Sequence, residues 1–100
     1  MSDIFHLVAR EAWDQVPGDY APRSLETEGF VHCSTQQQLE RVAIERFAGD
    51  DDLLVLRIDP SRLTAELRWE DSHADGELFP HIHGPVDRQA ILSVEPHRGF

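Results

Sequence analysis

The sequence predicts an α+β fold, a compact split β-sheet of about five or six strands with one main helix at about residues 35–48. Several short apolar runs are bounded by Pro, Gly and Asp, which is typical of the strands of a small sheet. Only the stretch after residue 35 carries apolar side chains at a sustained helical spacing. Neither a repeat nor a linker divides the 100 residues, so we expect one domain, 1–100.

The first elements follow from short patterns. Residues 4–8 are apolar except for His6, which predicts a buried strand with His6 on the face opposite its neighbours. Apolar residues at helical spacing predict a short helix over 9–16, which Pro17 ends. Residues 24–27 have the capping chemistry of a single helical turn.

The main helix has a clear beginning and end. Ser34 with Gln37, or Thr35 with Gln38, offers a capping box, and Gly49 stands where a left-handed residue ends a helix. The inward stripe comprises Leu39, Val42, Ala43 and Phe47, with the polar Arg46 at its edge.

The second half of the chain predicts further strands. Residues 53–58 are a continuous apolar run, and residues 65–70 alternate between apolar and polar, as a half-buried strand does. The segment 78–85 is apolar but interrupted by Pro, so we expect an irregular edge strand or a site loop. The remaining predictions are a helical turn at 60–63, a loop at 71–77, a last strand at 90–94 and a tail from 96 to 100.

Charge and composition exclude several classes of protein. The net charge is −10, and all nine basic residues are Arg, which argues against a broad nucleic-acid or membrane-binding surface. None of the apolar runs approaches the roughly 18 residues of a membrane span. The N-terminal residues lack the pattern of an export signal, and Cys33 is the only cysteine. We therefore expect a reducing, cytoplasmic location.

Four of the six histidines, His6, His32, His81 and His83, lie in apolar settings. A single His in a strand is more often a hydrogen-bonded core residue than a catalyst. Four of them in a small domain are easier to explain if they line one pocket, because each buried imidazole needs two partners.

Three other chemistries fit these residue types. His81 and His83 share one face of a strand and could begin a metal site, completed by His6, His32, Glu70 or Cys33, but this spacing is weak evidence. Cys33 could be a thiol nucleophile at a helix start, although the favoured interpretation is a small buried apolar residue that packs in the core. Glu70 could be a general base beside Trp69, or simply an exposed strand end.

The stretch GFVHCS at residues 29–34 runs directly into the main helix and is the strongest site candidate. Alternation along a strand points His32 and Ser34 to one side and Cys33 to the other, together with Val31. We therefore expect His32 and Ser34 to face the pocket that His6 shares, while Cys33 belongs to the core.

Taken together, the ordered motifs resemble the domain of unknown function 952 family of small bacterial proteins. The motifs that carry the resemblance are IFHL at 4–7, Trp13, Tyr20, Ser24-Leu25, EGFVHCS at 28–34, Gln38, Trp69-Glu70 and FPHIHGP at 79–85. His83 stands where that family usually has Tyr, which argues against a metal-binding His81–His83 pair.

That family is similar in fold to the ADP-ribosyltransferase superfamily, including the RNA 2′-phosphotransferases. The resemblance implies a split sheet that holds an NAD-like ligand in the cleft between its halves. It implies that His6 bonds the nicotinamide ribose and that Ser34 braces the same sugar or the nicotinamide. It also implies that Glu70 or His81 orients the attacking group. With His32 from the GFVHCS stretch, the expected catalytic residues are His6, His32, Glu70 and His81.

Arg10 or Arg23 is the residue that we expect to hold the pyrophosphate bidentately. The leading hypothesis is thus a pocket for NAD or a related nucleotide, which the protein transfers, hydrolyses or only binds. A non-catalytic small-molecule-binding module is the alternative from another class, and a His-based metal enzyme comes third. The expected cofactor is NAD, and no metal is expected.

Overall fold

The computed structural model describes residues 2–14, 18–47, 49, 52–71 and 74–97, and it contains two three-stranded antiparallel sheets. One sheet has the strand order β1-β3-β6 and the other β2-β5-β4. The strands are β1 (Ile4–Ala9), β2 (Val31–His32), β3 (Leu53–Ile58), β4 (Glu66–Glu70), β5 (Phe79–His83) and β6 (Ile91–Pro96). This arrangement confirms the predicted split sheet.

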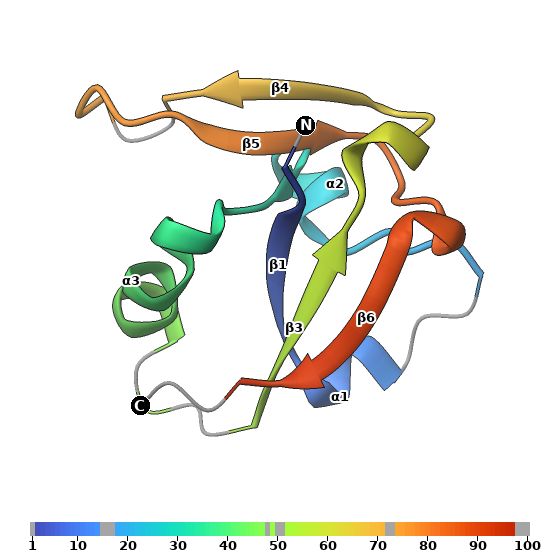
Figure 1. Ribbon diagram of the computed structural model, residues 1–100, viewed down its shortest axis with the longest axis horizontal. Coiled ribbons are helices and arrows are strands. Elements are labelled where there is room, and N and C mark those ends of the chain that lie inside the picture. The colour runs from blue at the N-terminus through green and yellow to red at the C-terminus, as the bar shows by residue number, and fades with distance from the viewer. Residues whose placement is uncertain (1, 15–17, 48, 50–51, 72–73, 98–100) are drawn as a thin grey trace.

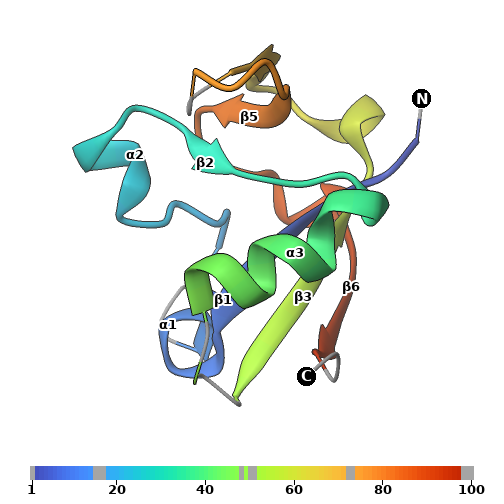
Figure 2. The ribbon, with the colours of Figure 1, turned by 90° about the vertical axis from the view of Figure 1, so that its left-hand side faces the viewer.

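The helices connect the strands and flank one sheet. They are α1 (Arg10–Asp14), α2 (Ser24–Thr27) and α3 (Gln36–Phe47), with short 3-10 turns η1 (Pro60–Arg62) and η2 (Arg88–Ala90). The long helix α3 lies alongside β1, while β4 and β5 run across one end of the β1-β3-β6 sheet (Figures 1 and 2). None of the described helices is long and apolar enough to cross a membrane.

Of the two capping boxes predicted for the start of α3, the structure contains the one formed by Thr35 and Gln38. The Thr35 hydroxyl accepts a hydrogen bond from the Gln38 amide at 3.2 Å, and the Gln38 side-chain oxygen accepts one from the Thr35 amide at 3.0 Å. This reciprocal capping box pairs two donors that a helix start leaves without partners. It fixes where the chain turns from the GFVHCS stretch into the helix.

The prediction for residues 78–85 was wrong, because β5 is the central strand of its sheet and not an edge. A central strand tolerates Pro only where the missing N–H would have no partner. The Pro80 carbonyl accepts a bond from the Cys33 amide at 3.0 Å, and β2 ends one residue earlier at His32. Pro80 has no N–H that could donate a hydrogen bond back to Cys33. The proline therefore lies opposite the point where β2 leaves the sheet.

Smaller differences concern the ends of elements. The helix predicted over 9–16 begins at Arg10, and residues 15–17 lie outside the described part of the chain. The strand expected along the GFVHCS stretch is only the two residues of β2. The last strand extends to Pro96, into the predicted tail, of which residues 98–100 are not described.

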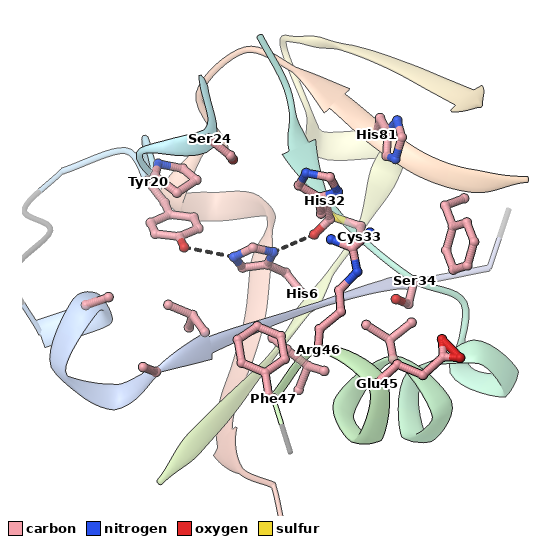
Figure 3. A pocket seen from close by; sticks show the side chains of 17 residues that line it. His6, Tyr20, Ser24, His32, Cys33, Ser34, Glu45, Arg46, Phe47 and His81 are labelled. Carbon is pink, nitrogen blue, oxygen red and sulfur yellow. Dashed lines mark hydrogen bonds between the residues drawn. The ribbon is translucent and has the colours of Figure 1, made fainter. Parts of the chain in front are cut away.

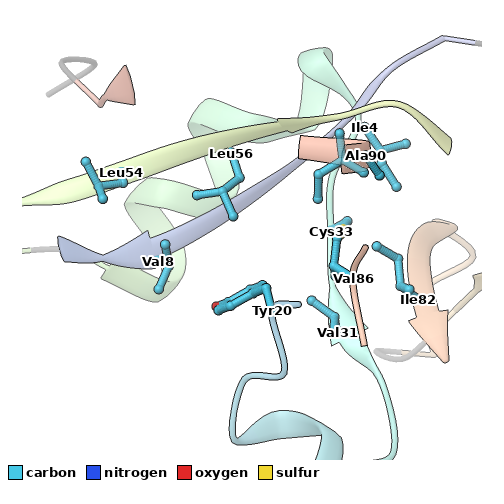
Figure 4. Packing of buried hydrophobic residues seen from close by; sticks show 11 residues of the cluster. Ile4, Val8, Tyr20, Val31, Cys33, Leu54, Leu56, Ile82, Val86 and Ala90 are labelled. Atoms are coloured by element: carbon cyan, nitrogen blue, oxygen red, sulfur yellow. The ribbon is translucent and has the colours of Figure 1, made fainter. Parts of the chain in front are cut away.

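One core joins the two sheets. Buried residues from both sheets and from the loops between them form a single cluster (Figure 4). Its members are Ile4, Val8, Tyr20, Val31, Cys33, Leu54, Leu56, Ile58, Ile82, Val86 and Ala90. Cys33 packs in this core with Val31, as the alternation of the strand predicted.

The sheets are also joined by main-chain hydrogen bonds. The Phe5 amide donates to the Ser34 carbonyl at 2.8 Å, and the Ser34 amide donates to the Phe5 carbonyl at 2.7 Å. This isolated bridge connects β1 to the segment that follows β2. From this bridge β1 and residues 29–34 diverge (Figure 2).

Gly84 makes a close approach that permits no side chain. A Cβ atom at this position would lie 2.8 Å from the Ala65 Cβ. We expect Gly84→Ala to lower the free energy of unfolding by about 1–3 kcal/mol, as other overpacked sites do, measured by urea denaturation. In a protein that already carries Ala65→Gly, the change Gly84→Ala should lower the free energy of unfolding by less. If Gly84→Ala costs the same free energy with Ala65 and with Gly at position 65, the steric explanation is wrong.

Candidate functional site

A cavity of about 360 Å³ opens between β1, α3 and the GFVHCS stretch (Figure 3). Its polar lining brings together four residues that the sequence singled out: His6, His32, Ser34 and His81. Apolar side chains cover much of the rest, among them Leu7, Val8, Val42, Phe47 and Phe79. A cavity of this size and mixed lining is typical of a small-molecule site.

His6 is held at both ring nitrogens. Nδ1 lies 2.6 Å from the His32 carbonyl oxygen, and Nε2 lies 2.8 Å from the Tyr20 hydroxyl (Figure 3). A carbonyl only accepts, so Nδ1 carries the proton and the Tyr20 hydroxyl donates to Nε2. Tyr20 is 2% exposed, and burial raises the pKa of its hydroxyl, which keeps it a donor.

Burial also sets the charge of His6. It lowers the pKa of His6 from 6.5 to about 4, against the opposing effect of the bond to the His32 carbonyl. The imidazole is therefore neutral at pH 7. In this arrangement His6 braces the cavity wall by linking β1, the Tyr20 loop and β2.

His32 lines the cavity and is partly exposed. Its Nε2 is 2.9 Å from a Glu28 carboxylate oxygen, and this hydrogen bond lowers the pKa of Glu28. The Phe30 ring lies 4.8 Å from the His32 ring, centroid to centroid. The carboxylate fixes which nitrogen of His32 is protonated, because it can only accept.

His81 is the most enclosed of these histidines. Its side chain is 1% exposed, and the Phe30 ring stacks on it at 4.1 Å with an interplanar angle of 18°. Nδ1 lies 2.9 Å from Glu70 Oε1, and the same oxygen lies 2.8 Å from Nε2 of His83. These two bonds lower the pKa of Glu70, while burial lowers the pKa of His81 despite the carboxylate.

Ser34 and Cys33 differ in their surroundings. Ser34 is 4% exposed, its backbone bridges to Phe5 and its side chain lines the cavity. Cys33 also contacts the cavity but belongs to the core cluster, and burial raises the pKa of its thiol. A thiol that stays protonated is a poor nucleophile, so its burial favours a packing role for Cys33.

The predicted arginines do not line the cavity. Arg10 pairs with Asp52 at 2.9 Å, and Arg23 is exposed at the start of α2; neither is part of the cavity wall. Among the described lining residues the one arginine is Arg46, which reaches from α3 toward His32 (Figure 3). The sequence feature that could have identified Arg46 as a lining residue is its position at the edge of the inward-facing stripe of α3.

Glu70 is not part of the cavity lining either and reaches it only through His81. Tyr20 and Glu28, the partners of His6 and His32, were not predicted as site residues. The bond to Tyr20 spans 14 residues and depends on tertiary packing. Glu28 lies only four residues before His32, but the two lie outside any helix whose spacing would have predicted the pair. Within the part of the chain that the structure describes, no group of three or more His, Cys, Asp or Glu side chains could hold a metal ion.

Comparison with known proteins assigns the family. The sequence profile described as "Protein of unknown function (DUF952)" matches residues 7–94, which is most of the chain. The chain belongs to the DUF952 family. The residues matched include the GFVHCS stretch, the FPHIHGP segment and α3, so the cavity wall lies almost wholly within the shared region.

Solved structures of a DUF952-like fold support the same assignment. The chain is similar to the crystal structure of protein CC0527 from Caulobacter crescentus, with 26% identity and a TM-score of 0.80 over 95% of this chain and 85% of that one. A solution NMR structure of CC0527 gives a TM-score of 0.79 at 26% identity, covering 96% and 84%. No curated protein matches this DUF952 chain.

The buried His6 predicts a pH dependence of stability. Its folded pKa of about 4 lies below the unfolded value of 6.5, so the unfolded state binds more protons between these values. This contribution is fully present above about pH 6.5 and is lost as the pH falls toward 4, a change of about 3 kcal/mol.

We expect His6→Asn to reduce the slope of unfolding free energy against pH in that window, measured by urea denaturation at each pH. His81 also has a lowered pKa and contributes to the slope in both proteins. Equal slopes in wild type and variant would show that His6 is not held neutral by burial.

Proposed function

We propose that the cavity of this DUF952 protein binds NAD or a related ADP-ribose nucleotide. The observation that carries the proposal is the convergence of His6, His32, Ser34 and His81 on one cavity between the two sheets, with Arg46 in its wall. From the resemblance to ADP-ribosyltransferases we expect the ligand in the cleft between the halves of a split sheet. This cavity is lined by residues of both sheets.

The lining suits a ligand with an aromatic ring and an anionic group. Leu7, Val42, Phe47 and Phe79 offer apolar surface for a nicotinamide or adenine ring. Arg46 offers a guanidinium that can bind a phosphate bidentately. Because the net charge is −10, a local cation is needed to draw an anion to this surface.

The imidazoles fit the electrostatics of glycosidic bond cleavage. Loss of nicotinamide from NAD leaves an oxocarbenium-like cation on the ribose, which a protonated histidine would repel. Burial lowers the pKa of both His6 and His81, so both are neutral at pH 7. This supports transfer or hydrolysis of the bound nucleotide.

A binding module without catalysis is the second candidate, and a specific observation favours it. Among the described lining residues Glu45 is the one carboxylate, and Glu70 lies behind His81. A site with few groups able to stabilise a cation directly is suited to recognition. Release of nicotinamide by the purified protein separates the two candidates.

Arg46 provides the binding test. We expect NAD and ADP-ribose to raise the melting temperature of the wild type, and Arg46→Ala to weaken their binding by about tenfold or more, as the loss of a charged hydrogen bond does. Isothermal titration calorimetry measures the dissociation constants. Arg62→Ala is the matched control, because Arg62 is also exposed but lies outside the cavity and pairs with Asp59.

Two results would count against the proposal. If neither nucleotide shifts the melting temperature, the cavity does not bind this ligand class. If Arg46→Ala and Arg62→Ala weaken binding equally, the nucleotide binds elsewhere on the surface.

A further inference from the structure

The hydrogen bonds of the four clustered histidines determine which ring nitrogens remain available. His6 has both nitrogens engaged, so it offers none to a ligand. His32, His81 and His83 each donate one N–H to a carboxylate, from Nε2, Nδ1 and Nε2 respectively. In a neutral imidazole the other nitrogen then carries a lone pair and can only accept.

His81 combines this lone pair with enclosure. Its side chain is 1% exposed and lines the cavity, and its Nδ1–H is held by Glu70. Its Nε2 makes no hydrogen bond to any described residue. A fully buried side-chain nitrogen or oxygen without a partner does not occur in the described part of the chain, so Nε2 cannot be fully buried. The open surface that His81 lines is the cavity.

We propose that Nε2 of His81 is the proton acceptor of this site and that Glu70 positions it. The inference rests on the proposed function and names the group that would activate the attacking molecule. Glu70 is a positioning residue, because it acts only through the His81 ring. His83 donates a second hydrogen bond to the same Glu70 Oε1, and Phe30 stacked on His81 limits the ring to one plane.

The step balances without a further reactant. The oxygen of a water, or of an acceptor hydroxyl, forms a bond to C1′ of the ribose while the bond from C1′ to the nicotinamide nitrogen breaks. The electron pair of the broken bond leaves with nicotinamide and neutralises its ring. The proton lost by the attacking oxygen moves to Nε2 of His81, and the resulting imidazolium is stabilised by the Glu70 carboxylate.

Several titratable and charged groups surround His81. Glu70 and His83 face it from β4 and β5, His32 faces it from β2 at 5.4 Å between ring centroids, and Glu28 lies behind His32. Arg68 pairs with His81 in the strand register, and Arg46 lines the same cavity from α3. Of these, Glu70 is the carboxylate that contacts the His81 ring directly.

The tautomer of His81 is measurable without any ligand. Long-range proton–nitrogen NMR of ¹⁵N-labelled protein at pH 7 should show His81 protonated at Nδ1 and unprotonated at Nε2. In Glu70→Gln a fraction protonated at Nε2 should appear, while Glu66→Gln, a carboxylate on the same strand that pairs with Arg68, should leave the His81 signals unchanged. An Nε2–H tautomer in the wild type would overturn the proposal.

Kinetics test the proton transfer itself through nicotinamide release from NAD. We expect His81→Asn to lower kcat by about 100-fold or more with little change in KM, as loss of a general base does. Glu70→Gln should lower kcat by about tenfold and move the acid limb of the pH–rate profile to lower pH. The direction follows because the carboxylate raises the pKa of His81, opposing burial.

The outcomes separate this proposal from the proposed function. If NAD binds but the wild type releases no nicotinamide, or if His81→Asn matches the wild type, the assignment of His81 fails while nucleotide binding stands. An unmoved acid limb in Glu70→Gln would overturn the role of Glu70. If neither NAD nor ADP-ribose binds, the proposed function fails, and the tautomer alone decides whether His81 presents a lone pair to the cavity.

Discussion

The pair of main-chain hydrogen bonds between Phe5 and Ser34 is the constraint on which the site depends. It joins β1 to the segment that follows β2, and β1 and the GFVHCS stretch diverge from this point (Figure 2). His6 follows Phe5 directly, and His32 precedes Ser34 by two residues, so the bridge brings both histidines to the same opening. The cavity is the space that this divergence leaves, enclosed by α3 and the Tyr20 loop.

Desolvation decides the chemistry of that space. The protein carries a net charge of −10, yet the imidazoles nearest the core are neutral, because burial opposes their protonation more strongly than nearby acceptors favour it. Each charged carboxylate in the cluster, Glu28 or Glu70, lies behind a histidine and reaches the cavity only through that ring. The histidine side of the cavity therefore presents ring nitrogens and hydroxyls to a ligand, while α3 contributes Glu45 and Arg46.

The fold was predictable where the deciding interactions are local. The capping box of Thr35 and Gln38 spans four consecutive residues, so its sequence signature located the start of α3 correctly. The β5 strand was misplaced for the opposite reason. Whether a strand with a central proline can be internal depends on which neighbour faces the missing N–H, and here that neighbour is Cys33, far away in the sequence.

The sequence by itself determined the class of fold, the main helix, the family motifs, and the expectation that several histidines share one pocket. Only the tertiary structure decided what each histidine can do there, because the protonated nitrogen depends on partners brought by folding. Tyr20 and the His32 carbonyl occupy both nitrogens of His6, whereas Glu70 occupies one nitrogen of His81 and leaves the other open. Residue type and spacing carry no information about that difference, because it arises from long-range packing.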